Sequence, residues 1–119
     1  MSKKKILVAD DDLAILDAIE LILKDEGYKI EAVVNGQTIQ KVREHMPDLI
    51  LLDIWMSDAD GRDICKHLKS TDATKHIPII ICSANRHTKL IAKEAGADDF
   101  ILKPFELEDL IATVKKYTK

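Results

Sequence analysis

Residues 6–12 read ILVADDD, four apolar residues followed by three aspartates. The apolar run is typical of a buried strand, and the acids follow its carboxyl end. A second apolar run, residues 49–52, also ends in an acid, Asp53. In open parallel sheets, ligands bind at the carboxyl ends of the strands. If these two strands are neighbours, they bring at least three carboxylates to one point.

Such a cluster resists ionisation unless a cation neutralises it. Ligands that are all oxygen favour a hard divalent ion, Mg²⁺ or its close relative Mn²⁺. We therefore predict a metal site formed by Asp10, Asp11 and Asp53. Asp12 is expected instead to cap the helix that follows it.

Composition favours a soluble globular chain. Its 119 residues are 46% hydrophobic and 33% charged, which suits one domain, residues 1–119. The net charge of −3, with no basic block beyond residues 3–5, disfavours nucleic-acid binding. No apolar run suits a signal peptide or the ~18 residues of a membrane span, so we expect no membrane contact and a cytoplasmic location. Cys65 and Cys82 are expected to be reduced core residues.

Strand-like and helix-like segments alternate along the chain. The predicted strands are residues 5–9, 29–33, 49–53, 77–82 and 99–102. The first predicted helix has an apolar stripe from Ile15 to Leu23 and ends near Gly27, and the second has a stripe of Ile39, Val42 and Met46 and ends at Pro47. The other three predicted helices are residues 61–69, residues 86–95, which precede Gly96, and residues 106–118. Five β–α units predict a doubly wound five-stranded parallel sheet, flavodoxin-like in its order 2-1-3-4-5, with helices on both faces.

The edge that carries the acids receives further polar groups in this topology. The fourth strand leads into Ser83, and the fifth leads into Lys103 and Pro104. A carboxylate is ionised at neutral pH and can act as a nucleophile without a base, with a phosphoryl group as its natural electrophile. A metal ion and Lys103 would neutralise the phosphoryl oxygens, and Ser83 would donate a hydrogen bond to them.

Together these residues resemble the receiver domains of two-component response regulators. The resemblance covers essentially the whole chain, and the motifs that carry it are residues 6–12, 48–56, Gly61, Ser83-Ala84 and 96–105. It implies that Asp53 accepts a phosphoryl group from a sensor histidine kinase or a histidine phosphotransfer protein. It also implies that Asp10 and Asp11 hold Mg²⁺ together with the backbone carbonyl of Trp55.

The resemblance assigns a second group of residues to the switch. Ser83 would bind the phosphoryl group, and Phe100 would be the aromatic residue that turns inward on activation. Lys103 matches the family's lysine, and its peptide bond to Pro104 is expected to be cis. The surface of the fourth helix, fifth strand and fifth helix would then change and present itself to a downstream protein.

The loop after Asp53 departs from the family pattern. Ser57 stands where the family usually has proline, which predicts a somewhat looser loop. Asp58 and Asp60 are expected to be solvated turn residues. Trp55 would either anchor a partner or shield the site. The four histidines show no ligand spacing and are expected at the surface.

Three other functions are weaker interpretations of this sequence. An aspartyl-nucleophile phosphatase would need a cap over its substrate, and the chain is short for one. A flavodoxin-like flavin binder would need a phosphate loop where this chain has three acids. A degenerate receiver that only docks is disfavoured by the full set of site residues. The sequence alone does not separate a stand-alone receiver from the first domain of a larger regulator.

Overall fold

A computed structural model describes residues 3–34, 37–56 and 58–119. Five strands form one parallel sheet in the order β2-β1-β3-β6-β7. The strands are β1 Lys5–Ala9, β2 Lys29–Val33, β3 Leu49–Asp53, β6 Ile79–Ser83 and β7 Asp99–Leu102. The helices are α1 Leu13–Asp25, α2 Thr38–His45, α3 Gly61–Ser70, α4 Thr88–Ala95 and α5 Leu107–Tyr117. The predicted doubly wound topology is confirmed, with β6 and β7 as the fourth and fifth predicted strands.

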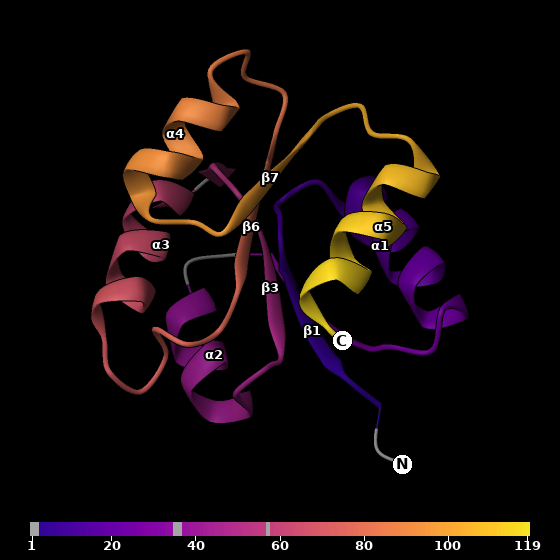
Figure 1. The fold of residues 1–119 in the computed structure, drawn as a ribbon, viewed down its shortest axis with the longest axis horizontal. Coiled ribbons are helices and arrows are strands. Elements are labelled where there is room, and N and C mark those ends of the chain that lie inside the picture. Colours follow the sequence, from indigo (N-terminus) through magenta and orange to yellow (C-terminus); the bar gives the residue numbers. More distant parts are fainter. Residues whose placement is uncertain (1–2, 35–36, 57) are drawn as a thin grey trace.

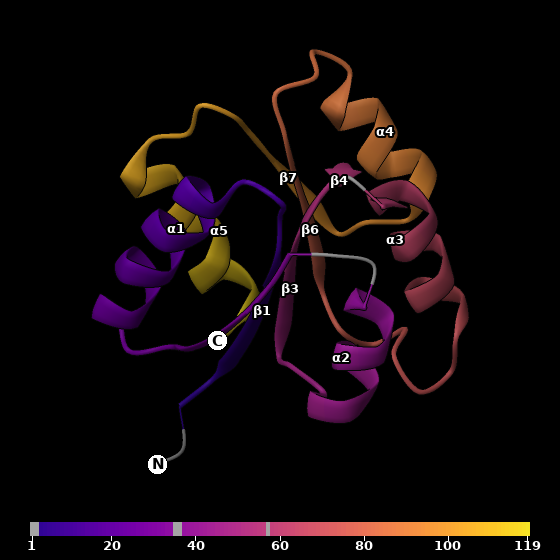
Figure 2. The same ribbon diagram turned by 180° about the vertical axis from the view of Figure 1, so that it is seen from behind.

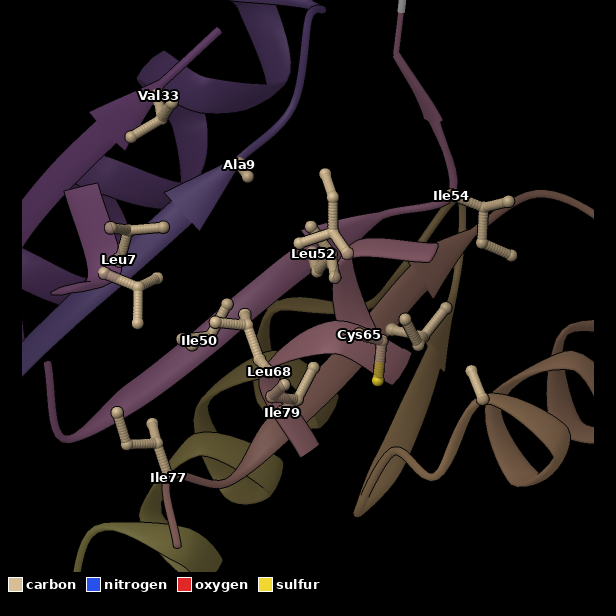
Figure 3. Close-up of a cluster of buried hydrophobic side chains, with 14 of the residues drawn as sticks. Leu7, Ala9, Val33, Ile50, Leu52, Ile54, Cys65, Leu68, Ile77 and Ile79 are labelled. Carbon is tan, nitrogen blue, oxygen red and sulfur yellow. The ribbon is translucent and has the colours of Figure 1, made fainter. Parts of the chain in front are cut away.

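Helices cover both faces of the sheet. Figures 1 and 2 show α1 and α5 on one face and α2, α3 and α4 on the other. The central strands are apolar on both sides, so alternate residues enter two separate cores. Leu7 and Ile50 belong to the core beneath α2, α3 and α4, which Figure 3 draws. Ile6 and Leu51 belong to the core beneath α1 and α5.

The helix ends follow the local sequence. Asp12 caps α1 as predicted, because its Oδ1 accepts hydrogen bonds from the backbone N–H groups of Ala14 at 3.0 Å and Ile15 at 3.3 Å. Gly27 and Gly96 follow α1 and α4 with φ angles of 96° and 83°. Glycine adopts this left-handed conformation without strain, so both residues end their helices as expected.

The fourth predicted strand begins two residues later than expected. β6 starts at Ile79 rather than at residue 77. The N–H of Ile77 donates to the carbonyl of Thr74 at 3.0 Å and so closes a turn before the strand. Pro78 has no N–H to give to a ladder, and it precedes the strand instead of starting it.

Two apolar residues of the predicted helices are exposed to solvent and lie outside the core. Met46 follows α2 in a left-handed conformation, φ 44°, and is 39% exposed. Pro47 prevents continuation of α2, as predicted. α4 begins at Thr88, two residues later than predicted, and its Leu90 is 54% exposed. Small buried residues of α4, such as Ala92, pack into the core beneath α2, α3 and α4 instead.

A second, two-stranded sheet was not predicted. β4 Trp55–Met56 pairs antiparallel with β5 Ala59–Asp60, directly after β3. The looser loop predicted from Ser57 concerns a position outside the described residues. Within the described part of the chain, no helix has the length and apolar character needed to cross a membrane.

Both cysteines are free and buried. Burial raises the pKa of Cys65 to about 11 and that of Cys82 to about 12. Since the thiolate is the reactive form, about 0.1% or less of either thiol is reactive at pH 8. We expect the folded protein to resist Ellman's reagent at pH 8 and to release two equivalents of the coloured thiolate once unfolded in guanidinium chloride. Rapid labelling of the folded protein would show that one core opens.

Candidate phosphoryl-transfer and metal site

Three carboxylates meet at the carboxyl ends of two neighbouring strands. β1 and β3 pair in parallel with Ala9 opposite Leu52, so Asp10 and Asp53 leave the sheet side by side. One oxygen from each of Asp10, Asp11 and Asp53 lies within 4.8 Å of the others. Asp10 is 2% exposed and Asp53 is 8% exposed, whereas Asp11 is exposed to solvent. The predicted juxtaposition of the three acids is therefore present.

Lys103 reaches the same point from the end of β7. Its Nζ donates to Oδ2 of Asp10 at 2.6 Å and lies 3.5 Å from Oδ1 of Asp53. Burial by itself would lower the pKa of Lys103, but the hydrogen bond that Lys103 donates to Asp10 and the charges of both acids outweigh it and raise that pKa. The lysine is therefore a fixed positive charge at neutral pH. Its peptide bond to Pro104 is cis, as the resemblance implied.

The ionised form of Asp53 is costly in this environment. Burial is the main cause of a raised pKa for this carboxyl; the positive charge of Lys103 opposes the rise, and the negative charges of Asp10 and Asp11 add to it. Three carboxylates and one ammonium group leave the centre with an excess of negative charge. A hard divalent cation with oxygen ligands fits this donor set and would relieve the repulsion.

Ser83 lies next to the acids as the last residue of β6. β6 pairs with β3 so that Cys82 is opposite Asp53, which brings Ser83 to the same edge. Ser83 is 2% exposed, and its Oγ accepts a hydrogen bond from the N–H of Asn85 at 3.1 Å. Phe100 lies on β7 opposite Ile81, half-buried against the core beneath α2, α3 and α4.

The short β4–β5 hairpin carries a contact that the sequence did not reveal. Trp55 pairs with Asp60, is 54% exposed, and lies with its ring centroid 4.8 Å from the guanidinium of Arg62. Asp60 was expected to be a solvated turn residue, and this was wrong. Its carboxylate caps α3 through the N–H of Arg62 at 2.9 Å and binds the same guanidinium at 2.7 Å. An acid directly before a predicted helix is a capping signal that could have found it.

Gly61 joins this hairpin to the acid site. Its N–H donates to the carbonyl of Ile54 at 2.7 Å. A Cβ added at Gly61 would lie 2.0 Å from the backbone oxygen of Asp53. Only a residue without a side chain fits, so the start of α3 packs directly on the backbone that carries Asp53.

The histidines take no part in this site. All four are exposed to solvent, as predicted. Lys103 and the three acids therefore provide the charges of the centre.

The sequence matches the family model of the response regulator receiver domain over residues 6–115. The chain belongs to this family. Among curated proteins, it is 35% identical over 116 residues to the DNA-binding response regulator MtrA of Mycobacterium tuberculosis, covering 95% of this chain and 50% of that protein. MtrA of Mycolicibacterium smegmatis is 34% identical, with the same coverage. The receiver chain thus spans about half the length of these relatives.

Solved structures agree with this assignment. The chemotaxis response regulator CheY4 of Vibrio cholerae superimposes with a TM-score of 0.90 at 26% identity, covering 98% of this chain and 99% of that one. The receiver domain of NtrX from Brucella abortus gives 0.86 at 30% identity, covering 95% and 97%. The chain is a receiver domain of the two-component response regulators, a class consistent with a phosphoaccepting switch.

The raised pKa of Asp53 predicts an effect on the receiver's stability. The folded state holds the proton of this carboxyl more tightly than the unfolded state, so stability falls as pH rises from about 3.8 through the folded-state pKa. At pH 7, well above the ordinary pKa of 3.8, the ionisation of this buried carboxyl costs folding free energy. We therefore expect Asp53→Asn to raise the melting temperature of the metal-free protein at pH 7, and the difference to shrink toward pH 4. Lys103 keeps Asp10 as its partner in this variant. A lower melting temperature at pH 7 would contradict the electrostatic account.

Proposed function

We propose that Asp53 is the phosphoacceptor of this receiver. The observation that carries the proposal is a buried carboxylate held between an ammonium group, 3.5 Å away, and an acidic pair. Its oxygen would attack the phosphorus of a phosphohistidine on a sensor kinase or phosphotransfer protein. The O–P bond forms while the N–P bond breaks, and the electron pair stays on the departing imidazole, which is then protonated. The carboxylate needs no base, because it has no proton to lose when ionised.

Asp10, Asp11 and Asp53 are the residues that would hold Mg²⁺ or Mn²⁺, with the backbone carbonyl of Trp55 as a further ligand. The bound ion would supply positive charge to the phosphoryl oxygens. Lys103 would supply the second positive charge and remain paired with Asp10 until the phosphoryl group arrives. Ser83 would donate its hydroxyl proton to a phosphoryl oxygen. That hydroxyl already accepts a hydrogen bond from Asn85, so its own proton is available to a second partner.

The output is proposed to be a population shift. Ser83 and Phe100 lie at the end and in the middle of adjacent strands, β6 and β7. Inward movement of Ser83 would let Phe100 turn inward and so alter the α4–β7–α5 surface that meets a downstream protein. Phosphorylation shifts the balance only through contacts that differ between the two states. A change from 1:99 to 99:1 needs about 5.5 kcal/mol.

Further parts of the proposal concern extent and setting. We take residues 1–119 as one receiver domain that catalyses only its own phosphorylation and dephosphorylation, without a separate substrate. MtrA, which is about twice as long, is a DNA-binding response regulator, and we propose no direct nucleic-acid or membrane contact for this receiver. A cytoplasmic location is supported by the two free cysteines, as a reducing compartment preserves them.

Acetyl phosphate tests the chemistry without the partner kinase. We expect intact-protein mass spectrometry to show the mass of one added phosphoryl group in the presence of Mg²⁺, and no addition with EDTA. Asp53→Asn should abolish the addition. Asp72→Asn, at a carboxylate whose side chain is 96% exposed, should leave it unchanged. Equal labelling of wild type and Asp53→Asn would refute the assignment, and turnover of p-nitrophenyl phosphate would favour a phosphatase.

A further inference from the structure

A cavity lies at the amino-terminal end of the parallel strands, opposite the end that carries the acids. Its volume is about 410 Å³, within the range of small-molecule sites, and it opens at the amino ends of β1 and β2. β1 runs from Lys5 beside the cavity to Ala9 beside the acid site, so the strand separates the two. In Figure 1 this is the end of β1 that lies toward the N-terminus. The proposed phosphoryl chemistry makes no use of this cavity.

Apolar groups form much of the cavity wall. Ile6 and Ile30 are paired residues of β1 and β2, and Tyr28 and Pro47 line the wall beside them. The Tyr28 hydroxyl is already engaged, 2.8 Å from Oγ1 of Thr118, which leaves the ring as its contribution. This surface would gain from contact with an apolar or aromatic body.

The rim of the cavity is strongly basic, although the chain as a whole carries a charge of −3. Lys3, Lys5, Lys24 and Lys29 all line it, against a single acid, Glu31.

Only one of these lysines has its charge neutralised by a described ion pair. Lys24 binds Glu20 at 2.6 Å. Lys5 donates its Nζ to the backbone oxygen of His45 at 2.8 Å, which leaves its charge uncompensated. Within the described ranges, the Lys3 and Lys29 side chains make no hydrogen bond or ion pair. Two ammonium groups at the rim thus remain available to a ligand.

We propose that this cavity binds a small organic anion that has an apolar body. The charged head, a carboxylate, sulfonate or phosphate, would lie against Lys3 and Lys29, and the body would lie against Ile30 and the Tyr28 ring. A metal cation is repelled by the lysines, and a bare inorganic anion would gain nothing from the apolar wall. A neutral molecule would leave the ammonium groups unused. Both halves of the cavity therefore select the same class of ligand.

An aromatic sulfonate is a direct probe of this site. We expect 8-anilinonaphthalene-1-sulfonate to bind the full chain with enhanced fluorescence. Lys3→Gln/Lys29→Gln should weaken its binding about fivefold or more, as the loss of two ammonium contacts implies. The matched control is Lys89→Gln/Lys93→Gln on α4, which removes the same charge from exposed positions and should leave binding unchanged. The uncharged analogue N-phenyl-1-naphthylamine should not respond to either pair of substitutions.

Two further measurements decide location and ligand class. In ¹H–¹⁵N spectra, the largest shifts on addition of the sulfonate should fall on residues 28–31. Decanoate should displace the probe, whereas acetate and inorganic phosphate should not. Equal weakening of probe binding in both double variants would show that the net charge of the protein, and not Lys3 and Lys29, sets the affinity. Chemical-shift changes elsewhere, or displacement of the probe by acetate, would overturn the proposal. Asp53→Asn should bind the probe like wild type, so this test stands apart from that of the phosphoacceptor.

Discussion

Gly61→Ala is expected to destabilise the receiver by about 3 kcal/mol and to weaken its Mg²⁺ binding at least tenfold. The added Cβ would lie 2.0 Å from the backbone oxygen of Asp53 and 2.9 Å from the Cα of Ile54. Both contacts are with backbone, so no side-chain rotation relieves them. Either α3 moves away from β3, or the chain that carries Asp53 is displaced from Asp10 and Asp11. Denaturant unfolding measures the first effect, and calorimetric titration with Mg²⁺ measures the second.

Gly27→Ala is the matched control for this substitution. Gly27 also departs from ordinary backbone, with φ 96°, but an added Cβ there has no atom within 4 Å. We expect a loss of about 1 kcal/mol from the left-handed conformation and unchanged Mg²⁺ affinity. If both variants lose the same affinity for Mg²⁺, general destabilisation accounts for the effect, and the close approach of Gly61 to Asp53 does not position the site.

The parts of this receiver that the sequence predicted are those specified by local pattern. Unbroken apolar runs specify β1 and β3, and the acids that follow them specify the edge where the site forms. Right-handed crossovers limit the topology to a few choices, and the common doubly wound order 2-1-3-4-5 makes β1 and β3 neighbours. That order places Asp10 beside Asp53 without any knowledge of distances. The predicted boundaries of α3 and α5 held to within one residue at each end.

The parts that escaped prediction depend on tertiary contacts. Leu90 satisfies helical spacing, but α4 buries small residues against the sheet, and periodicity alone does not distinguish the two faces of so short a helix. The pairing of Trp55 with Asp60 spans only a short loop and has no apolar alternation to reveal it. The stacking of Arg62 on Trp55 depends on the geometry of that hairpin. Such contacts are decided by packing once the chain is folded.

Lys103→Met is expected to lower the stability of the metal-free receiver by about 3 kcal/mol while tightening Mg²⁺ binding about tenfold. Lys103 is the cation beside two buried carboxylates, at 2.6 Å from Asp10 and 3.5 Å from Asp53. Its removal leaves both without a counter-ion, which costs folding free energy. The same removal takes away a positive charge that repels a divalent cation at this site. The two effects have opposite signs, so they separate in thermal melts recorded with EDTA and with Mg²⁺.

Lys69→Met provides the comparison for this prediction. Lys69 is another partly buried lysine, paired with Asp98 at 2.7 Å at the opposite end of β6 from Ser83. Its loss should also destabilise the fold, but Mg²⁺ should restore no more stability than in wild type. For Lys103→Met the gain on adding Mg²⁺ should clearly exceed the wild-type gain, since ligand binding stabilises in proportion to the logarithm of its affinity. A gain equal to that of Lys69→Met would mean that the Lys103 ammonium group and the cation do not share one electrostatic site.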